Sequence, residues 1–291
     1  MQDRFTSTPQ IHSADIIRIG VFDSGVGGLT VLQEIYRQLP NESVLYFGDT
    51  ARVPYGTRSA AEIIQFTRQT LDWMVAQGVK MAIVACNTSS ALALETVRSE
   101  YDLPILGVIL PGARAAALQG RRIGVIATPA TVKSNAYLHA IQEANPNAQV
   151  WQVACPEFVP LIETNRINDP QTLAIAQEYI QPLLDRSIDT LIYGCTHYPH
   201  LEPVLRQFIP MSVKFINPAM AVVAAAAKEL NVLGIQSHHP AIPTQFVVSG
   251  NPAQFKQVAT QWLPAVPIVH QIALPISVAS KPIDIGQNPV T

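Results

Sequence analysis

Short apolar runs and amphipathic stretches alternate along most of the chain. The apolar runs are bounded by turn residues, which predicts strands at residues 17–22, 43–47, 81–86, 104–108, 122–125, 149–153, 189–193, 212–215 and 244–249. Between them, apolar residues recur at helical spacing, which predicts helices at residues 29–39, 59–77, 171–184 and 219–230 and another from residue 89. Strands that alternate with helices in this way predict parallel α/β sheets.

Turn and capping residues divide this pattern into units. Ser59 and Glu62 form a capping box that opens the second predicted helix. Pro111 and Gly112 mark a crossover into a second domain. We therefore expect a first domain at residues 17–111 and 218–267 and a second domain at residues 112–217. Residues 1–16 and 268–291 show little periodicity and are expected to be mobile or extended.

Two cysteines stand at matching places in this pattern. Cys86 and Cys195 each follow an apolar run, and a threonine comes soon after each of them. The sequence RIGV at residues 18–21 recurs at residues 122–125, with nearly the same offset that separates the two cysteines. These paired landmarks predict an internal duplication with one thiol at the end of an equivalent strand in each half. Chemistry in open α/β sheets is found at such strand ends.

Composition narrows the class of protein. Hydrophobic residues make up 48% of the 291 residues, charged residues make up 14%, and the net charge is −2. Without a Lys/Arg-rich block, the chain lacks the electrostatic footprint of a nucleic-acid binder, so we expect a small substrate and no nucleic-acid partner. Three cysteines are too few for a disulfide framework and indicate a reducing compartment. No signal peptide or membrane span is predicted, and the expected location is the cytoplasm.

Each cysteine has alternative interpretations. Free cysteines are often small buried hydrophobes, but the matched contexts of Cys86 and Cys195 favour chemistry, whereas Cys155 is expected to pack in the core. A zinc site with Cys195 and His197 as ligands is a second alternative, although the chain has no Cys-x-x-Cys and no His-x-x-x-His motif. A redox dithiol is disfavoured because the two cysteines lie far apart in the sequence.

The polar residues near these cysteines suit acid–base chemistry on a small substrate. His197 is placed to accept a proton from Cys195 or to orient it, rather than to pack in a core. Asp23 either orients a base or forms an Asx-turn or helix cap. The glycines of residues 25–28 lack the full G-x-G-x-x-G spacing, and a backbone cradle for a small carboxylate is equally consistent with them. No cofactor is expected, since no lysine has the phosphate-binding loop that a pyridoxal enzyme needs.

Several longer motifs carry a resemblance to a known family. They are DSGVGG at residues 23–28, YFGDT at 46–50, PYG at 54–56, CNT at 86–88, CPEFVPLIE at 155–163 and GCTHYP at 194–199. In this order and spacing they resemble glutamate racemase over residues 17–267. The resemblance implies two pseudo-symmetric parallel-sheet, flavodoxin-like α/β domains with the active site in the cleft between them. It also implies cofactor-independent interconversion of L- and D-glutamate for peptidoglycan synthesis, and it leaves room for a homodimer.

The resemblance also assigns roles to individual residues. Cys86 and Cys195 are implied as the proton donors and acceptors, with Cys86 acting on D-glutamate and Cys195 on L-glutamate. Asp23 would assist Cys86, and His197, supported by Glu163, would assist Cys195. The residues implied to bind the substrate are Asp23, Ser24, Tyr55, Gly56, Asn87, Thr88, Thr128, Thr131, Thr196 and His197. No metal ligand is implied.

Other functions remain open on the residues alone. A racemase that acts on aspartate or on another amino acid would share the paired cysteines. A non-catalytic protein that binds an amino acid would share the neutral hydrogen-bond donors at loop positions, which are Thr88, Thr196, Thr128, Ser24 and Asn87. Substrate profiling separates the first alternative from glutamate racemase, and the optical rotation of a glutamate solution separates the second.

Overall fold

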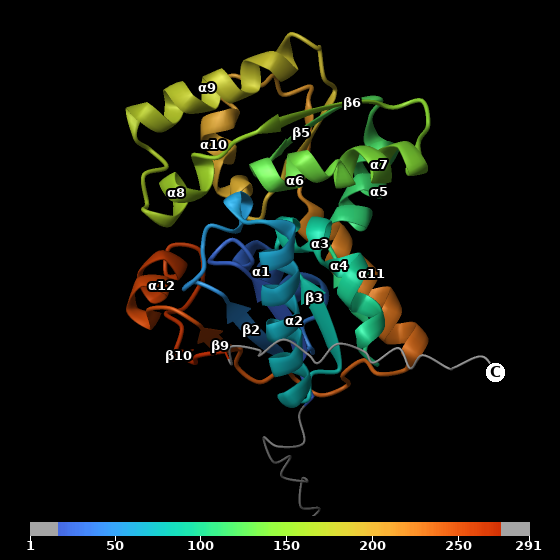
Figure 1. Ribbon diagram of the computed structural model, residues 1–291, viewed down its shortest axis with the longest axis vertical. Coiled ribbons are helices and arrows are strands. Elements are labelled where there is room, and N and C mark those ends of the chain that lie inside the picture. Colours follow the sequence, from blue (N-terminus) through green and yellow to red (C-terminus); the bar gives the residue numbers. More distant parts are fainter. Residues whose placement is uncertain (1–16, 275–291) are drawn as a thin grey trace, which may run out of the picture.

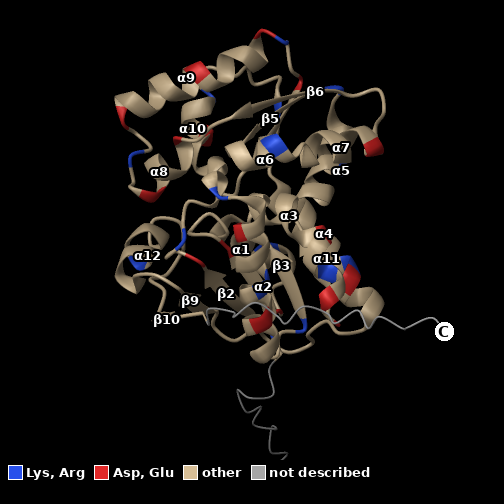
Figure 2. Ribbon diagram, in the orientation of Figure 1, with Lys and Arg blue, Asp and Glu red and all other residues tan. Residues whose placement is uncertain are grey.

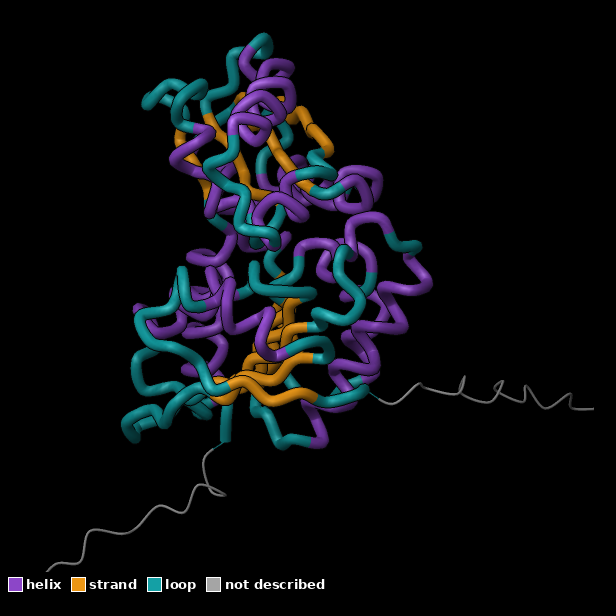
Figure 3. Tube along the Cα trace, turned by 90° about the vertical axis from the view of Figure 1, so that its left-hand side faces the viewer, coloured by secondary structure: helices purple, strands orange, loops and turns teal. Residues whose placement is uncertain are grey.

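The computed structural model describes residues 17–274, which form two parallel sheets that lie one above the other in Figures 1 and 3. The six-stranded sheet has the order β10-β9-β2-β1-β3-β4, and the four-stranded sheet has the order β6-β5-β7-β8. The strands are β1 (Ile19–Asp23), β2 (Val44–Gly48), β3 (Met81–Val84), β4 (Ile105–Gly107), β5 (Arg122–Ala127), β6 (Gln149–Ala154), β7 (Thr190–Gly194), β8 (Lys214–Ile216), β9 (Gln245–Val248) and β10 (Val269–Gln271). This confirms the predicted fold class.

Helices flank both sheets (Figure 1). They are α1 (Leu29–Gln38), α2 (Ala60–Ala76), α3 (Asn87–Leu92), α4 (Leu94–Val97), α5 (Ile109–Gln119), α6 (Pro129–Ser134), α7 (Ala136–Ala144), α8 (Phe158–Glu163), α9 (Pro170–Leu184), α10 (Glu202–Leu205), α11 (Pro218–Leu233) and α12 (Pro252–Ala259), with short 3₁₀ segments η2 (Tyr55–Thr57), η3 (Arg98–Glu100) and η4 (Tyr198–Leu201). Within residues 17–274, none of the helices has the length and apolar character that crossing a bilayer requires. Figure 2 shows acidic and basic positions interspersed over both halves.

The topology of the two sheets repeats. In chain order, the first four strands pair as β2-β1-β3-β4, and the next four pair as β6-β5-β7-β8. The recurring RIGV sequence leads into β1 and β5, which occupy the same position in their sheets. The cysteines follow β3 and β7, which are again equivalent strands. The internal duplication was predicted from the repeated RIGV sequence and the two matched cysteines. The equal strand order of the two sheets confirms it at the level of topology.

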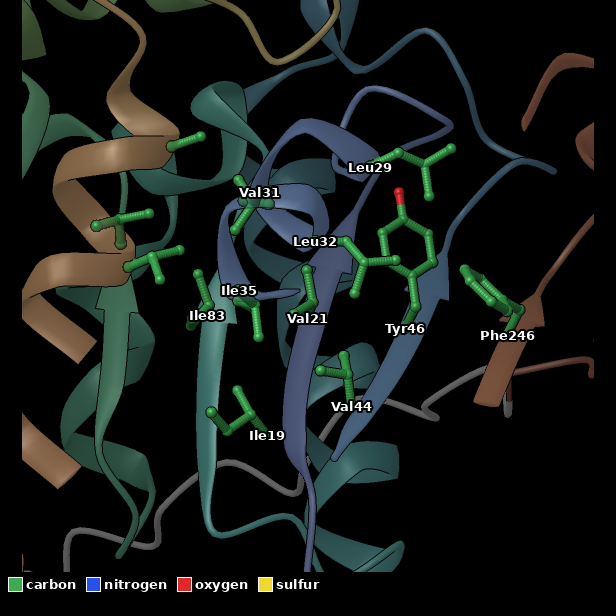
Figure 4. Close-up of a cluster of buried hydrophobic side chains, with 14 of the residues drawn as sticks. Ile19, Val21, Leu29, Val31, Leu32, Ile35, Val44, Tyr46, Ile83 and Phe246 are labelled. Carbon is green, nitrogen blue, oxygen red and sulfur yellow. The ribbon is translucent and has the colours of Figure 1, made fainter. Parts of the chain in front are cut away.

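The strands are buried because both faces of each sheet are covered. In β1, Val21 belongs to one hydrophobic cluster and Phe22 to another, as expected when successive side chains point to opposite faces. Figure 4 shows the first of these clusters, in which Val21 and Tyr46 of the sheet face Leu32 and Ile35 of α1. Parallel strands that are covered on both faces appear in the sequence as continuous apolar runs, which is why they were easy to predict.

Local capping chemistry sets several helix boundaries. The Ser59 hydroxyl accepts the backbone N–H of Glu62, and the Glu62 carboxylate accepts the backbone N–H of Ser59, so the predicted capping box is confirmed. Helices α6 and α7 were not predicted. Their start does carry a signal, because Thr128 caps α6 by accepting the N–H of Thr131, and Pro129 follows as the first helical residue.

The predicted domain boundaries lie near two features of the structure. Pro111 and Gly112, which were predicted to mark a crossover, lie inside α5, which connects the two sheets. Proline is tolerated there because the first N–H groups of a helix have no intrahelical acceptor, and Gly112 admits the close approach of Pro218. At the other end, Val269–Gln271 form β10 on the edge of the first sheet, so this sheet extends beyond residue 267. The predictions for residues 1–16 and 275–291 lie outside the described residues.

Candidate active site

Cys86 and Cys195 line one small cavity between the two halves. The cavity has a volume of about 40 Å³. Cys86 follows β3 and Cys195 follows β7, so each thiol lies at the carboxyl end of an equivalent strand. The cavity is lined by Ser24, Pro54, Tyr55, Gly56, Thr57, Cys86, Asn87, Thr88, Thr128, Pro129, Pro156, Val159, Cys195, Thr196 and His197. None of these residues is Lys or Arg, so a charged substrate would meet mostly neutral groups.

Cys86 occupies the cap position of helix α3. Its backbone is extended, with φ −61° and ψ 119°, and its side chain is 5% exposed. Burial, followed by the negative charge of Asp23, raises the pKa of the Cys86 thiol to about 12. The thiol donates to the Ser24 hydroxyl at 3.9 Å. Cys86 is therefore a protonated thiol at neutral pH in this structure.

Cys195 has a different partner. Its sulfur lies 3.7 Å from Nδ1 of His197, and Nε2 of the same ring lies 2.7 Å from a carboxylate oxygen of Glu163. Burial disfavours the charged imidazole, but the hydrogen bonds to Cys195 and Glu163 outweigh it and raise the pKa of His197 well above its usual value. Burial would likewise raise the pKa of Glu163, yet the hydrogen bond with His197 brings it below its usual value. This chain of three groups favours a protonated His197 ring beside the sulfur of Cys195.

Asp23 contacts the Cys195 side of the site rather than Cys86. One of its oxygens accepts the backbone N–H of Gly25 at 3.0 Å, and the other accepts the hydroxyl of Thr196 at 3.0 Å. Burial raises the pKa of this carboxyl, although His197 and these hydrogen bonds lower it in part. Asp23 therefore reaches Cys86 through its charge, and its hydrogen bonds join the two halves.

The glycine-rich turn does not form the predicted cradle for a substrate carboxylate. Its backbone amides serve the chain's own carboxylates, because Gly25 donates to Asp23 and Val26 donates to Glu163 at 3.2 Å. The glycines permit this packing. A Cβ added at Gly27 would lie 2.4 Å from Nδ1 of His197, and one added at Gly25 would lie 2.3 Å from the Glu163 carboxylate. The turn therefore packs one half against the acid–base groups of the other.

Neutral donors line the side of the cavity between α3 and α6. The hydroxyls of Thr88 and Thr128 lie 3.0 Å apart, and Thr131 lies 3.3 Å from Thr88 and 3.0 Å from Thr128. Thr131 is fully buried behind the other two and does not line the cavity. Beside them, the amide oxygen of Asn87 accepts the hydroxyl of Tyr137 at 2.7 Å. These contacts join the first half, which carries α3, to the second half.

The loop around η2 forms another side of the cavity. Tyr55 and Gly56, which the family resemblance implies as substrate-binding residues, line the cavity, and the hydroxyl of Tyr55 donates to the buried carboxylate of Asp49. A Cβ added at Gly56 would lie 2.6 Å from Cβ of Thr128, so glycine allows this loop to contact the second half closely. Within residues 17–274, no group of three or more His, Cys, Asp or Glu side chains is arranged to hold a metal ion.

Comparison with known proteins decides which family this geometry belongs to. The profile of the Asp/Glu/Hydantoin racemase family matches residues 19–226. Over 263 residues the chain is 62% identical to the glutamate racemase of Gloeothece citriformis, covering 90% of this chain and 95% of the relative. The fold matches a glutamate racemase isoform from Bacillus anthracis with a TM-score of 0.86 at 36% identity, over 90% of this chain and 99% of that one. A glutamate racemase from Francisella tularensis, solved in complex with D-glutamate, matches with a TM-score of 0.82 at 36% identity, over 89% and 97%.

The chain belongs to the glutamate racemase family. The predicted site residues fall into two groups according to whether they line the cavity. Those that line the cavity are Ser24, Tyr55, Gly56, Cys86, Asn87, Thr88, Thr128, Cys195, Thr196 and His197. The three that stand behind it are Asp23, Thr131 and Glu163, each hydrogen-bonded to a lining residue. Cys155 is fully buried in a hydrophobic cluster, as expected.

Other residues of the site were not predicted from the sequence. They are Pro54, Thr57, Pro129, Pro156 and Val159, which also line the cavity. Pro54, Pro156 and Val159 lie within the motifs at residues 54–56 and 155–163, and Pro129 directly follows a predicted site residue. Behind the lining residues, Asp49 lies in the motif at residues 46–50. Tyr137 has no such signal, because its importance depends on a partner that is distant in the sequence.

Proposed function

We propose that this protein racemises glutamate by a two-base mechanism in which Cys86 and Cys195 exchange protons with opposite faces of Cα. The observation that carries the proposal is that two cysteines from topologically equivalent strands line one cavity. Inversion at carbon needs a proton removed from one face and another returned to the other face. Two thiols on opposite sides provide this without moving a single base around the substrate.

The two cysteines differ in their environments, and this difference sets the starting state. Cys195 beside His197 is the thiolate and abstracts the Cα proton, forming an S–H bond as the C–H electron pair passes to the carbanion. Cys86 is the thiol and donates its proton to the opposite face of the carbanion, becoming a thiolate. Hydrogen-bond donors around the cavity stabilise the negative charge on the carboxylate end of the carbanion. In the reverse direction the two cysteines exchange roles, with Cys195 serving L-glutamate and Cys86 serving D-glutamate.

Glutamate is the substrate that the comparisons favour over aspartate. The relatives with at least 36% identity named above are glutamate racemases, and one of them was solved with D-glutamate. The neutral donors of Asn87, Thr88 and Thr128 suit carboxylates, which are acceptors only. We further propose that the product D-glutamate feeds peptidoglycan synthesis in the cytoplasm. The homodimer stays a prediction, which sedimentation would check.

The test is racemisation in D₂O without added cofactor. L-glutamate should lose its optical rotation, and the D-glutamate formed early should carry deuterium at Cα while the remaining L-glutamate does not, because different sulfurs handle the two protons. The Cys86→Ala and Cys195→Ala variants should each fail to racemise. Each should still exchange the Cα hydrogen of the one enantiomer that its remaining thiol faces.

Cys155→Ala is the matched control, since Cys155 is a free cysteine that lies in the core of the second half and not at the cavity. It should retain racemase activity. Full racemisation by the Cys86→Ala, Cys195→Ala double variant would rule out the two-thiol mechanism. Binding of glutamate without any change of optical rotation in the unaltered protein would instead indicate a non-catalytic binding protein.

A further inference from the structure

The side-chain amide of Asn87 is held in one orientation. Asn87 directly follows Cys86, is 3% exposed and lines the cavity. A side-chain amide presents an acceptor oxygen on one side and two N–H donors on the other, so its orientation decides what it can bind. The oxygen of Asn87 accepts the hydroxyl of Tyr137 at 2.7 Å. With its oxygen engaged there, the NH₂ group is left for the cavity.

The hydroxyl of Tyr137 is a hydrogen-bond donor whose position is fixed by packing. It is fully buried on α7, where its ring packs in the hydrophobic cluster of the second half with Ile109, Ile123 and Ile141. Burial raises the pKa of the Tyr137 phenol above its usual value, so the hydroxyl keeps its proton. A phenol with a rigid ring and a permanent proton favours the amide oxygen over the amide nitrogen as its partner.

The cavity has few other donors to offer a carboxylate. The Thr196 hydroxyl proton is directed to Asp23, and the Tyr55 hydroxyl proton is directed to Asp49. Both hydroxyls therefore present only lone pairs to a ligand. In a cavity lined by no Lys or Arg, the two N–H groups of Asn87 are among the few donors left for the substrate's carboxylates.

We propose that Tyr137 is a positioning residue that fixes the amide of Asn87 so that its NH₂ group faces the cavity and binds a carboxylate of the substrate. Tyr137 does not line the cavity and acts through Asn87. The two residues come from different halves of the chain, so the amide is set correctly only when the halves are in contact. This inference rests on the proposed racemisation of glutamate.

The experiment compares Tyr137→Phe with the unaltered protein. Without the phenol hydroxyl, the amide can rotate, and the substrate loses a fixed donor in the ground state and in the transition state alike. We expect KM to rise about tenfold while kcat changes by less than about threefold, the pattern of lost uniform binding. Tyr193→Phe is the matched control: Tyr193 is equally buried, and its hydroxyl donates to Glu202 at 3.1 Å, away from the cavity. Its KM should be unchanged.

A double-mutant cycle separates positioning from a general structural role. In an Asn87→Ala background, Tyr137→Phe should raise KM no further, because its effect passes through the amide. Asn87→Asp retains an oxygen for Tyr137 and places a second oxygen where the NH₂ group was, so it should fold and bind glutamate at least about tenfold more weakly. An unchanged KM in Tyr137→Phe, additive effects in the cycle, or glutamate binding by Asn87→Asp at the unaltered affinity would each overturn the inference. Absence of turnover in the unaltered protein would instead refute the proposed function.

Discussion

Replacing Glu163 by Gln tests the chain of groups that activates Cys195. The substitution keeps the shape of the side chain and removes its charge. In the structure, a carboxylate oxygen of Glu163 is hydrogen-bonded to Nε2 of His197 at 2.7 Å. Nδ1 of the same ring lies 3.7 Å from the sulfur of Cys195. Loss of the carboxylate charge should make the imidazolium less favourable, and the thiolate that it accompanies should become less favourable with it.

The magnitude follows from the contacts. At 3.7 Å and an effective dielectric constant of about 20, the imidazolium and thiolate attract each other by about 4 kcal/mol. The charged hydrogen bond from His197 to Glu163 contributes a further 1.5–3 kcal/mol, roughly. Removing the hydrogen bond to Glu163 should lower the pKa of His197 and reduce kcat/KM at neutral pH by about 10- to 100-fold.

The assay is the rate of change of circular dichroism with each glutamate enantiomer, repeated across neutral and alkaline pH. In Glu163→Gln, activity should recover as pH rises, because Cys195 then loses its proton without help from the imidazolium. Both directions should lose the same factor in kcat/KM, since the enantiomers have equal free energy in water. Glu157→Gln is the control: Glu157 lies just before α8, accepts the hydroxyl of Tyr179 and does not line the cavity.

The reasoning would be refuted if Glu163→Gln kept kcat/KM within about twofold at neutral pH with an unshifted profile. That result would mean that His197 does not need its carboxylate partner to stay protonated beside Cys195. An equal loss in Glu157→Gln would point to a general disturbance of α8 instead.

Three other substitutions test separate features. Ser59→Ala should lower the free energy of unfolding by about 1 kcal/mol through loss of the α2 cap and leave kcat/KM unchanged; an unaltered urea midpoint would contradict this. Gly27→Ala should abolish most activity, because the new Cβ would lie 2.4 Å from Nδ1 of His197 and from Oγ1 of Thr196; unaltered rates of glutamate racemisation would show that the turn can yield. Asp23→Asn should lower activity yet raise the thermal midpoint at neutral pH. Burial raises the folded pKa of Asp23 above its ordinary value of 3.8, so its ionisation reduces stability as pH rises through the folded value. A lower calorimetric midpoint than that of the unaltered protein at neutral pH would refute this account.

The amino-acid sequence by itself determined the local structure and the chemical groups. Buried parallel strands such as β1 and β7 appear as continuous apolar runs, and the cap at Ser59 depends on residues only three positions apart. The doubled fold was evident because RIGV and the two cysteines recur at nearly equal offsets. These features were predictable because each depends on neighbours in the chain or on a literal repeat.

The resemblance to a family, rather than any pattern, supplied Glu163 and the site residues Tyr55, Gly56 and Thr131. No local signal showed that the crossover at Pro111 and Gly112 is helical, yet both residues lie inside α5. The strand β10 is short and lies on a sheet edge, so its pairing with β9 is not visible in the pattern of residues 269–271.

Only the tertiary structure decided how the groups of the site work together. The bond from Val26 to Glu163, the bond from Thr196 to Asp23 and the bond from Tyr137 to Asn87 each join residues at least 50 positions apart. Sequence spacing carries no information about such pairs, because their geometry depends on how two separately folded sheets pack. That packing gives one thiol an imidazole partner and leaves the other protonated in an otherwise symmetric fold.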